Sequence, residues 1–242
     1  MDGMAALIAQ LKARSSVTSE QTSDACPICG GSGYILRRDE KGELFSRECK
    51  CEVIRQNQRR IERSGLKPLL ENCTFDRYKA LDPWQKSAKE TAEKYVDDHD
   101  GKWFFIGGSS GTGKTRLCTA ICGELMGKGV PVRYVQWRSD IPPIKAKIND
   151  ADAYQAAIWP LKTVKALYID DFLKGSVSDG DKNIAFDLLN ARYNNPDAIT
   201  LISSELTIDK ILEWDEAIGS RIAERSKGYT LNLRGKQNWR LR

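Results

Sequence analysis

A glycine-rich loop near the middle of the chain carries residues whose types and spacing suit phosphate chemistry. Residues 108–115 match the pattern G-x-x-x-x-G-K-[ST] at every fixed position. Glycines permit a tight turn that brings backbone N–H groups up to phosphate oxygens. Lys114 adds a positive charge for the β- and γ-phosphates, and the Thr115 hydroxyl is a ligand for Mg²⁺. The pattern predicts a nucleoside triphosphate site without distinguishing ATP from GTP. The predicted site residues are Gly108, Ser109, Ser110, Gly111, Thr112, Gly113, Lys114 and Thr115.

The segments on either side of this loop are those that a phosphate-binding loop requires. Residues 103–106 are apolar and predict a buried strand. Apolar side chains at positions 118, 121, 122 and 125 have helical spacing, and glycines at 127 and 129 predict the end of that helix. The alternative is a glycine-rich turn that binds nothing. A strand before the loop and the positive end of a helix dipole after it favour phosphate binding.

A second apolar segment, residues 164–171, predicts a central strand that ends in two acids. This is the Walker B pattern, in which Asp170 holds Mg²⁺ through water and Asp171 orients or deprotonates the attacking water. The alternative is a pair of acids that close a strand at a surface turn. Most motor ATPases of this kind have glutamate as the second acid. The shorter Asp171 therefore predicts slow hydrolysis without loss of nucleotide binding.

Polar residues also follow the next predicted strand, residues 198–202. Beside the Walker B acids they are placed to sense the γ-phosphate. These residues are Ser203, Ser204 and Glu205.

Two arginines lie four residues apart on a later predicted helix, and therefore on one face of it. Either they are solvated, or one of them reaches the nucleotide of a neighbouring subunit as an arginine finger. The two are Arg221 and Arg225.

Four of the seven cysteines form two close pairs in the first part of the chain. Cys26 and Cys29 flank a glycine-rich knuckle in the pattern C-x-x-C, and Cys49 and Cys51 follow after about twenty residues. Four thiolates make a closed tetrahedral set, which predicts structural Zn²⁺. The alternative is free core cysteines, but so small a module has too little core to fold without a metal. The first pair resembles the zinc-binding repeat of DnaJ-type chaperones, from which the second pair departs.

The totals suit one α/β domain with a smaller appendage, since the chain has 242 residues of which 40% are hydrophobic. No apolar run approaches the roughly 18 residues of a membrane span, and the N-terminus lacks the features of a signal peptide. We therefore expect a soluble cytoplasmic protein without membrane contact. In that reducing compartment, clustered cysteines are expected to bind metal rather than to form disulfides. We expect residues 1–66 to form an N-terminal docking helix, the metal module and a basic linker helix, and residues 67–242 to form the ATPase domain.

Three further segments have two interpretations each. The amphipathic residues 4–13 form either a docking helix for a partner or a helix packed on its own domain. The arginines between positions 55 and 63 are either solvated or in contact with nucleic acid. Phe75 and Tyr78 either border the adenine or pack in the core.

The order of these motifs resembles that of bacterial and phage replicative helicase loaders of the DnaC/DnaI kind, which share an AAA+ core with the IstB transposition ATPases. The resemblance covers about residues 75–242 and includes the segment GSRIAER and a basic Gly…Trp-Arg tail. It implies an α/β fold: an AAA+ P-loop three-layer domain with a parallel central sheet and no α-helical lid after the last strand. A zinc-binding module before this core is similar to DnaI-type and phage-encoded loaders.

The resemblance also implies roles for individual residues. ATP and Mg²⁺ bind at Lys114 and Thr115, with Asp170 and Asp171 as the Walker B pair. Arg225 matches the arginine finger best, Arg221 is the alternative, and Arg240 matches the sensor arginine. The first sensor is commonly asparagine in this family, so Ser203, Ser204 and Glu205 imply weak γ-phosphate sensing. The family binds single-stranded DNA inside a ring or spiral, and the resemblance places Lys145 and Lys147 near the bound DNA.

Our first hypothesis is an ATP-dependent loader that places a ring-shaped DnaB-type replicative helicase on single-stranded DNA. In this hypothesis the zinc module and N-terminal helix grip the helicase, and ATP organises the subunits into a spiral. The second is an IstB-like transposition helper ATPase that binds duplex DNA; the zinc module favours the loader. A small-molecule phosphotransferase would need an arginine-rich lid, which the sequence lacks. A zinc-dependent nucleic-acid-binding protein with a vestigial P-loop is the fourth possibility.

Overall fold

The computed structural model of the chain describes residues 26–38, 42–64, 67–175 and 177–239. The chain divides into two compact units, Met1–Asn57 and Gln58–Arg242, so that the division falls within helix α2 (Lys50–Ser64). The domain boundary expected after residue 66 stays a prediction. The docking helix expected at residues 4–13, and Arg240, lie outside the described residues.

The first unit contains a short antiparallel hairpin and the beginning of α2. Strands β1 (Tyr34–Arg38) and β2 (Leu44–Glu48) pair with Tyr34 opposite Glu48 and Arg38 opposite Leu44. A glycine-rich turn precedes β1, and Gly33 has φ of 79°, a left-handed conformation that glycine adopts readily. Cys49 lies directly between β2 and α2, and Cys51 lies in the first turn of that helix.

The second unit is built on a five-stranded parallel sheet. Its strand order is β4-β5-β6-β3-β7, which places β3 between β6 and β7 and brings the carboxyl ends of all five strands to one edge. In an open α/β sheet, ligands bind outside that edge. The strands are β3 (Phe104–Gly108), β4 (Val132–Gln136), β5 (Ala166–Phe172), β6 (Ile199–Ser204) and β7 (Thr230–Leu233).

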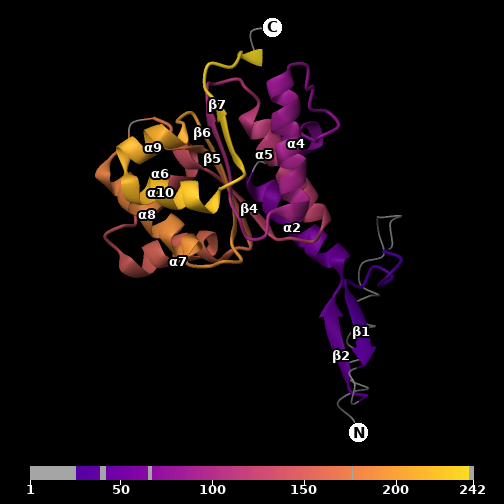
Figure 1. The fold of residues 1–242 in the computed structure, drawn as a ribbon. Coiled ribbons are helices and arrows are strands. Elements are labelled where there is room, and N and C mark those ends of the chain that lie inside the picture. Colours follow the sequence, from indigo (N-terminus) through magenta and orange to yellow (C-terminus); the bar gives the residue numbers. More distant parts are fainter. Residues whose placement is uncertain (1–25, 39–41, 65–66, 176, 240–242) are drawn as a thin grey trace. The chain divides into compact units, whose positions relative to one another are not determined.

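Helices cover both faces of this sheet (Figure 1). Because side chains alternate along β3, Phe104 and Ile106 join the hydrophobic cluster on one face, while Phe105 joins the cluster on the other. On the first face lie α3 (Lys67–Asn72), which contacts α5, α4 (Pro83–Asp98) and α5 (Lys114–Gly127). On the second face lie α6 (Trp137–Lys145), α7 (Ala151–Thr163), α8 (Asp179–Tyr193), α9 (Ile208–Trp214) and α10 (Glu216–Arg225).

The predicted three-layer α/β architecture with a parallel central sheet is confirmed by this arrangement. Within the described residues, no helix has the length and apolar character needed to cross a membrane.

The segment after β4 is helical although it contains two prolines. Helix α6 starts at Trp137 and includes Pro142 and Pro143, which supply no backbone N–H for intrahelical hydrogen bonds. Tertiary packing offsets this local cost, because Trp137, Ile141 and Ile144 are buried in the second hydrophobic cluster. The Trp137 ring lies 4.8 Å from that of Phe172 at the end of β5, so α6 supports the strand that carries the Walker B acids.

A fully buried arginine ties together the amino ends of β5 and β6. Arg192 is 0% exposed and donates to backbone carbonyls of Leu161 (2.9 Å), Val164 (2.9 Å) and Ile199 (2.7 Å). Its Nε also donates to the Thr200 hydroxyl at 2.9 Å. Burial lowers the pKa of Arg192 to about 9, which still leaves the group charged at neutral pH. Carbonyl dipoles rather than a carboxylate therefore compensate this charge.

We predict that Arg192→Met destabilises the second unit strongly. The substitution keeps an apolar stem but leaves several buried carbonyls without donors, so the free energy of unfolding should fall by about 3 kcal/mol or more. Urea denaturation monitored by circular dichroism measures this change. Arg138→Met, at an exposed position of α6, is the control and should shift stability by less than about 0.5 kcal/mol. Equal effects of the two substitutions would contradict the role given to Arg192.

Candidate nucleotide site and cysteine cluster

The phosphate-binding loop runs directly from β3 into α5. Gly113 caps the helix with φ of 88°, and Gly111 has φ of 75°, both in the left-handed region that favours glycine. The C-terminal segment packs against the loop: a Cβ on Gly111 would overlap the side chain of Asn238. The backbone N–H of Trp239 donates to the Gly111 carbonyl at 3.0 Å. Local backbone geometry and close packing therefore both require glycine here.

Lys114 is buried at the start of α5, with its ammonium group turned back onto the loop. Nζ donates to the carbonyls of Gly108 (2.9 Å) and Ser109 (2.8 Å). Burial lowers the pKa of Lys114, and the nearby carboxylates of Glu205 and Asp171 act in the opposite direction. The Lys114 ammonium group is thus bound to neutral carbonyls of the loop, and an anionic phosphate can replace them as its hydrogen-bond acceptor.

Asp170 is the polar centre of the strand edge. Its Oδ1 accepts from the Thr115 hydroxyl at 3.2 Å, from the Tyr168 hydroxyl at 2.7 Å and from the Ser203 hydroxyl. Its Oδ2 accepts from the Tyr134 hydroxyl at 3.1 Å. Burial, with the charge of Asp170, raises the pKa of Tyr134 and Tyr168, so both phenols stay protonated and donate.

This donor set fits Mg²⁺. The cation prefers a small number of protein oxygens together with water and substrate phosphates, and the Thr115 hydroxyl and Asp170 carboxylate lie side by side at the foot of the loop. They are the two residues that the sequence predicted for magnesium.

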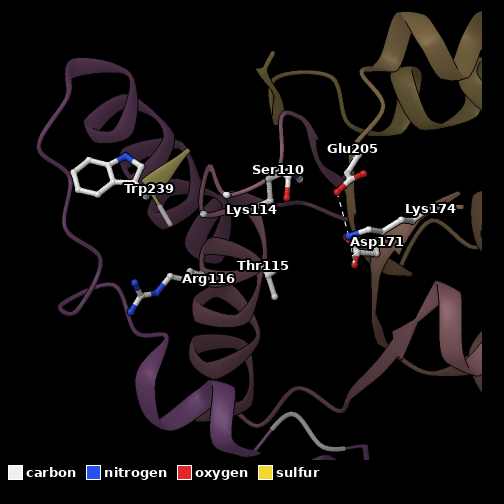
Figure 2. A pocket seen from close by; sticks show the side chains of 10 residues that line it. Ser110, Lys114, Thr115, Arg116, Asp171, Lys174, Glu205 and Trp239 are labelled. Carbon is white, nitrogen blue, oxygen red and sulfur yellow. Dashed lines mark hydrogen bonds and ion pairs between the residues drawn. The ribbon is translucent and has the colours of Figure 1, made fainter. Parts of the chain in front are cut away.

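A cavity of about 270 Å³ separates the loop from a second wall at the ends of β5 and β6 (Figure 2). Lys174 forms ion pairs of 3.1 Å with Asp171 and 3.1 Å with Glu205 on that wall. The lining residues are Ser110, Gly111, Gly113, Lys114, Thr115, Arg116, Asp171, Lys174, Glu205 and Trp239.

The predicted first-sensor residues have different surroundings from one another. The Ser203 hydroxyl donates to Asp170, and the Ser204 hydroxyl donates to the Phe172 carbonyl at 2.7 Å. Both serines are buried within the sheet, whereas Glu205 lines the cavity.

The two predicted finger arginines lie on α10 and contact their own chain. Arg225 donates to the carbonyls of Gly101 (2.7 Å), Pro196 (3.1 Å) and Asn195 (3.3 Å). Arg221 donates to Asn190 at 3.2 Å and to Ala217, and its guanidinium lies 5.0 Å from the centre of the Phe186 ring. Both are partly exposed.

Other predicted residues are placed as follows. Phe75 and Tyr78 belong to the first hydrophobic cluster, and a Cβ on Gly113 of the loop would lie 3.3 Å from the Tyr78 ring. Burial raises the pKa of Tyr78 to about 12. Lys145 pairs with Asp181 at 2.9 Å, and Lys147 is exposed.

Sequence analysis did not identify Lys174, Arg116 or Trp239 as lining residues. Lys174 could have been found from its position, because it follows the second Walker B acid by only three residues.

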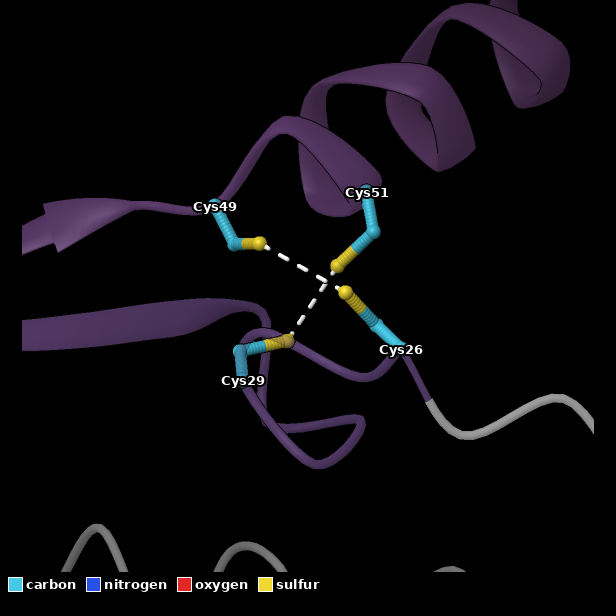
Figure 3. A group of neighbouring side chains, drawn as sticks. All are labelled: Cys26, Cys29, Cys49 and Cys51. Atoms are coloured by element: carbon cyan, nitrogen blue, oxygen red, sulfur yellow. Dashed lines mark hydrogen bonds between the residues drawn. The ribbon is translucent and has the colours of Figure 1, made fainter.

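The four predicted cysteines meet in the first unit (Figure 3). Their Sγ atoms all lie within 4.8 Å of one another, with Cys26 3.8 Å from Cys49 and Cys29 3.3 Å from Cys51. Thiolates bound to one tetrahedral zinc at about 2.3 Å are about 3.8 Å apart, so the donor set fits Zn²⁺. Burial raises the pKa of Cys29, but hydrogen bonds from Cys51 and the Gly33 N–H outweigh it and lower the value to about 6.

Comparison with known sequences places these features in a family. Residues 37–225 match the family described as IstB-like ATP binding protein. The chain belongs to this IstB-like ATP-binding family. The chain is 30% identical over 224 residues to the phage-like element PBSX protein XkdC of Bacillus subtilis (strain 168), an alignment covering 87% of this chain and 82% of XkdC. It is 28% identical over 201 residues to the replicative helicase loader DnaC of Escherichia coli (strain K12), covering 81% and 80% of the two chains.

Solved structures agree with the AAA+ fold expected for this IstB-like protein. The crystal structure of the DnaC helicase loader aligns with a TM-score of 0.56 and 19% identity, over 68% of this chain and 97% of that one. The replication initiator DnaA bound to AMPPCP and single-stranded DNA aligns with a TM-score of 0.55 and 20% identity, over 66% of this chain and 48% of the DnaA chain. At these identities the likeness establishes the fold.

We predict that this IstB-like chain contains one Zn²⁺ per molecule and that Cys29→Ser lowers the content well below one. Hydroxyl oxygen is a poor replacement for a thiolate ligand, and the first unit has little apolar core to hold its turn without the metal. Elemental analysis of protein purified without chelator measures the stoichiometry. Cys73→Ser, outside the cluster, should retain the metal. Zinc at full stoichiometry in Cys29→Ser would exclude Cys29 as a ligand.

Proposed function

We propose that this protein is an ATP-dependent loader of a ring-shaped replicative helicase. The observation that carries the proposal is the combination of a phosphate-binding loop and Walker B edge with a separate cysteine-cluster unit, in a relative of a named helicase loader. Self-association into a ring or spiral, single-stranded DNA as a partner and slow ATP hydrolysis are parts of the same proposal.

The nucleotide site supports ATP hydrolysis through residues on two elements. Lys114 neutralises charge on the β- and γ-phosphates, and Thr115 and Asp170 hold Mg²⁺, which when bound offsets the negative charge that develops on the phosphates. Asp171, at the opposite wall of the cavity, accepts a hydrogen bond from the attacking water and orients it.

The contacts on α10 favour Arg221 over Arg225 as the arginine finger. Three carbonyls hold the Arg225 guanidinium within its own chain, and moving it would leave them without that donor. Arg221 has fewer such contacts and stacks on Phe186, which is itself exposed. A finger must extend to a neighbouring subunit, and Arg221 loses less in doing so.

The first unit supports the role of a helicase-binding module. Its hairpin pairs only two strands, and apolar side chains point from both faces: Leu36 from one face and Phe45, opposite Arg37, from the other. Tyr34 and Leu36 lie two residues apart and therefore on the same face of β1, and neighbouring exposed apolar side chains on a small unit are typical of a protein interaction surface. The exposed large apolar residues of the unit are Ile28, Tyr34, Leu36 and Phe45.

A transposition helper ATPase is the second candidate, because the core motifs are shared and the matching family carries the IstB name. Parallel pulldowns with a replicative helicase and a transposase as bait distinguish the two. Retention by the transposase alone would overturn the loader proposal.

We predict that Lys114→Ala weakens ATP binding by about 10- to 100-fold, the effect of losing a charge-assisted contact of roughly 1.5–3 kcal/mol. Titration with a fluorescent ATP analogue and Mg²⁺ measures the dissociation constant. Lys128→Ala, at the other end of α5, should bind ATP like the wild type. Absence of triphosphate binding by the zinc-containing wild type would overturn the nucleotide assignment.

We predict that Leu36→Glu reduces co-purification with the replicative helicase by about tenfold or more, because a charge replaces an apolar contact in the proposed interface. The zinc content should remain at the wild-type level, since Leu36 is exposed on β1, pairs with Ser46 and is not one of the four clustered residues. Leu81→Glu, exposed in the second unit, is the matched control. Unchanged helicase retention in Leu36→Glu would remove the hairpin from the interface.

A further inference from the structure

A lysine that the predicted mechanism does not use lies at the centre of the second cavity wall. Nζ of Lys174 is 3.1 Å from Asp171 Oδ2 and 3.1 Å from Glu205 Oε1, so one ammonium group joins the ends of β5 and β6. Figure 2 shows these three side chains together, across the cavity from Lys114 and Thr115. The contacts with Glu205 and Asp171 outweigh the effect of burial and raise the pKa of Lys174, so it is charged at neutral pH.

The backbone at the end of β5 is shaped to produce this arrangement. The pairing of β5 with β6 shifts by one residue between Ile169 and Phe172, which is a β-bulge. Phe172 consequently occupies a buried position among the helices of the second face, and Asp171 is left at the cavity. Asp171 and Leu173 have φ of 53° and 59°, left-handed conformations that non-glycine residues adopt only where surrounding contacts hold them.

Two of the three residues expected to sense the γ-phosphate, Ser203 and Ser204, are engaged elsewhere. The Ser203 hydroxyl donates to Asp170 and the Ser204 hydroxyl to the Phe172 carbonyl, both inside the sheet. Lys174 is the cationic side chain on the wall formed by β5 and β6, in the part of the cavity lining that the structure describes. A phosphate between the two walls would meet Lys114 on one side and Lys174 on the other.

We propose that Lys174 binds the terminal phosphate of ATP and that this contact makes the site select triphosphate over diphosphate. The inference rests on the proposed nucleotide site and adds to it the residue that recognises the γ-phosphate. The glycine loop and Lys114 contact phosphates that ATP and ADP share, whereas Lys174 lies at the Walker B end of the cavity, where the terminal phosphate must be for Asp171 to act.

The charges on this wall support the same role. Without Lys174, the carboxylates of Asp171 and Glu205 would face the most negative part of the nucleotide with no positive charge between them. Like charges at such distances repel appreciably in a partly desolvated site. Removal of Lys174 therefore withdraws an attraction and exposes a repulsion, and both effects act on the triphosphate more than on the diphosphate.

The test compares the affinities of a non-hydrolysable ATP analogue and of ADP, each with Mg²⁺, for the full-length protein. Lys174→Met keeps most of the length of the side chain and removes its charge. It should weaken triphosphate binding by about tenfold or more and change ADP binding by less than about threefold. Lys210→Met removes a lysine from a surface ion pair with Glu213 and should leave both affinities unchanged.

A second variant separates phosphate binding from support of the wall. Glu205→Gln removes one carboxylate that holds Lys174, and it should bind the triphosphate at least as tightly as the wild type. If Glu205→Gln lost as much triphosphate affinity as Lys174→Met, the inference would be overturned. The affinity would then depend on the intact ion pairs of the wall and not on a contact between Lys174 and the phosphate.

An unchanged ratio of triphosphate to ADP affinity in Lys174→Met would also overturn it, while leaving the nucleotide site in place. Failure of the wild type to bind either nucleotide would instead refute the proposed function itself.

Discussion

The buried carboxylate of Asp170 is the interaction on which the arrangement of the site depends. A charge in this position is stable only if donors surround it. Here the donors come from four elements: Thr115 on α5, Tyr134 on β4, Tyr168 on β5 and Ser203 on β6. Satisfying one carboxylate therefore fixes the phosphate-binding loop against three strand ends. The same contacts aim the Thr115 hydroxyl and the carboxylate at one point, which is what a divalent cation requires.

Features determined by local spacing could be predicted from the sequence. The loop at residues 108–115, the acids that close β5 and the two cysteine pairs each depend on short patterns whose chemistry is known. The three-layer architecture was implied by the resemblance of the motif order to AAA+ helicase loaders, while apolar periodicity located only individual strands and helices. Local pattern alone does not account for helix α6, where burial of Trp137 and Ile144 outweighs the effect of two prolines.

Contacts between distant segments were not predictable from spacing. The Lys174 contact with Glu205 depends on a bulge in β5 and on the parallel register with β6, and neither has a sequence pattern of its own. The burial of Ser203 and Ser204 depends on β6 extending through both serines. The cavity lining by Trp239 depends on a chain segment that returns to the loop after β7.

The left-handed backbone at the second Walker B position has a consequence for which acid can occupy it. Asp171 has φ of 53°, and aspartate is enriched in this region among non-glycine residues, whereas glutamate is not. The turn that presents the acid to the cavity thus selects the shorter side chain. A glutamate at this position would therefore require the end of β5 to leave its left-handed conformation as well.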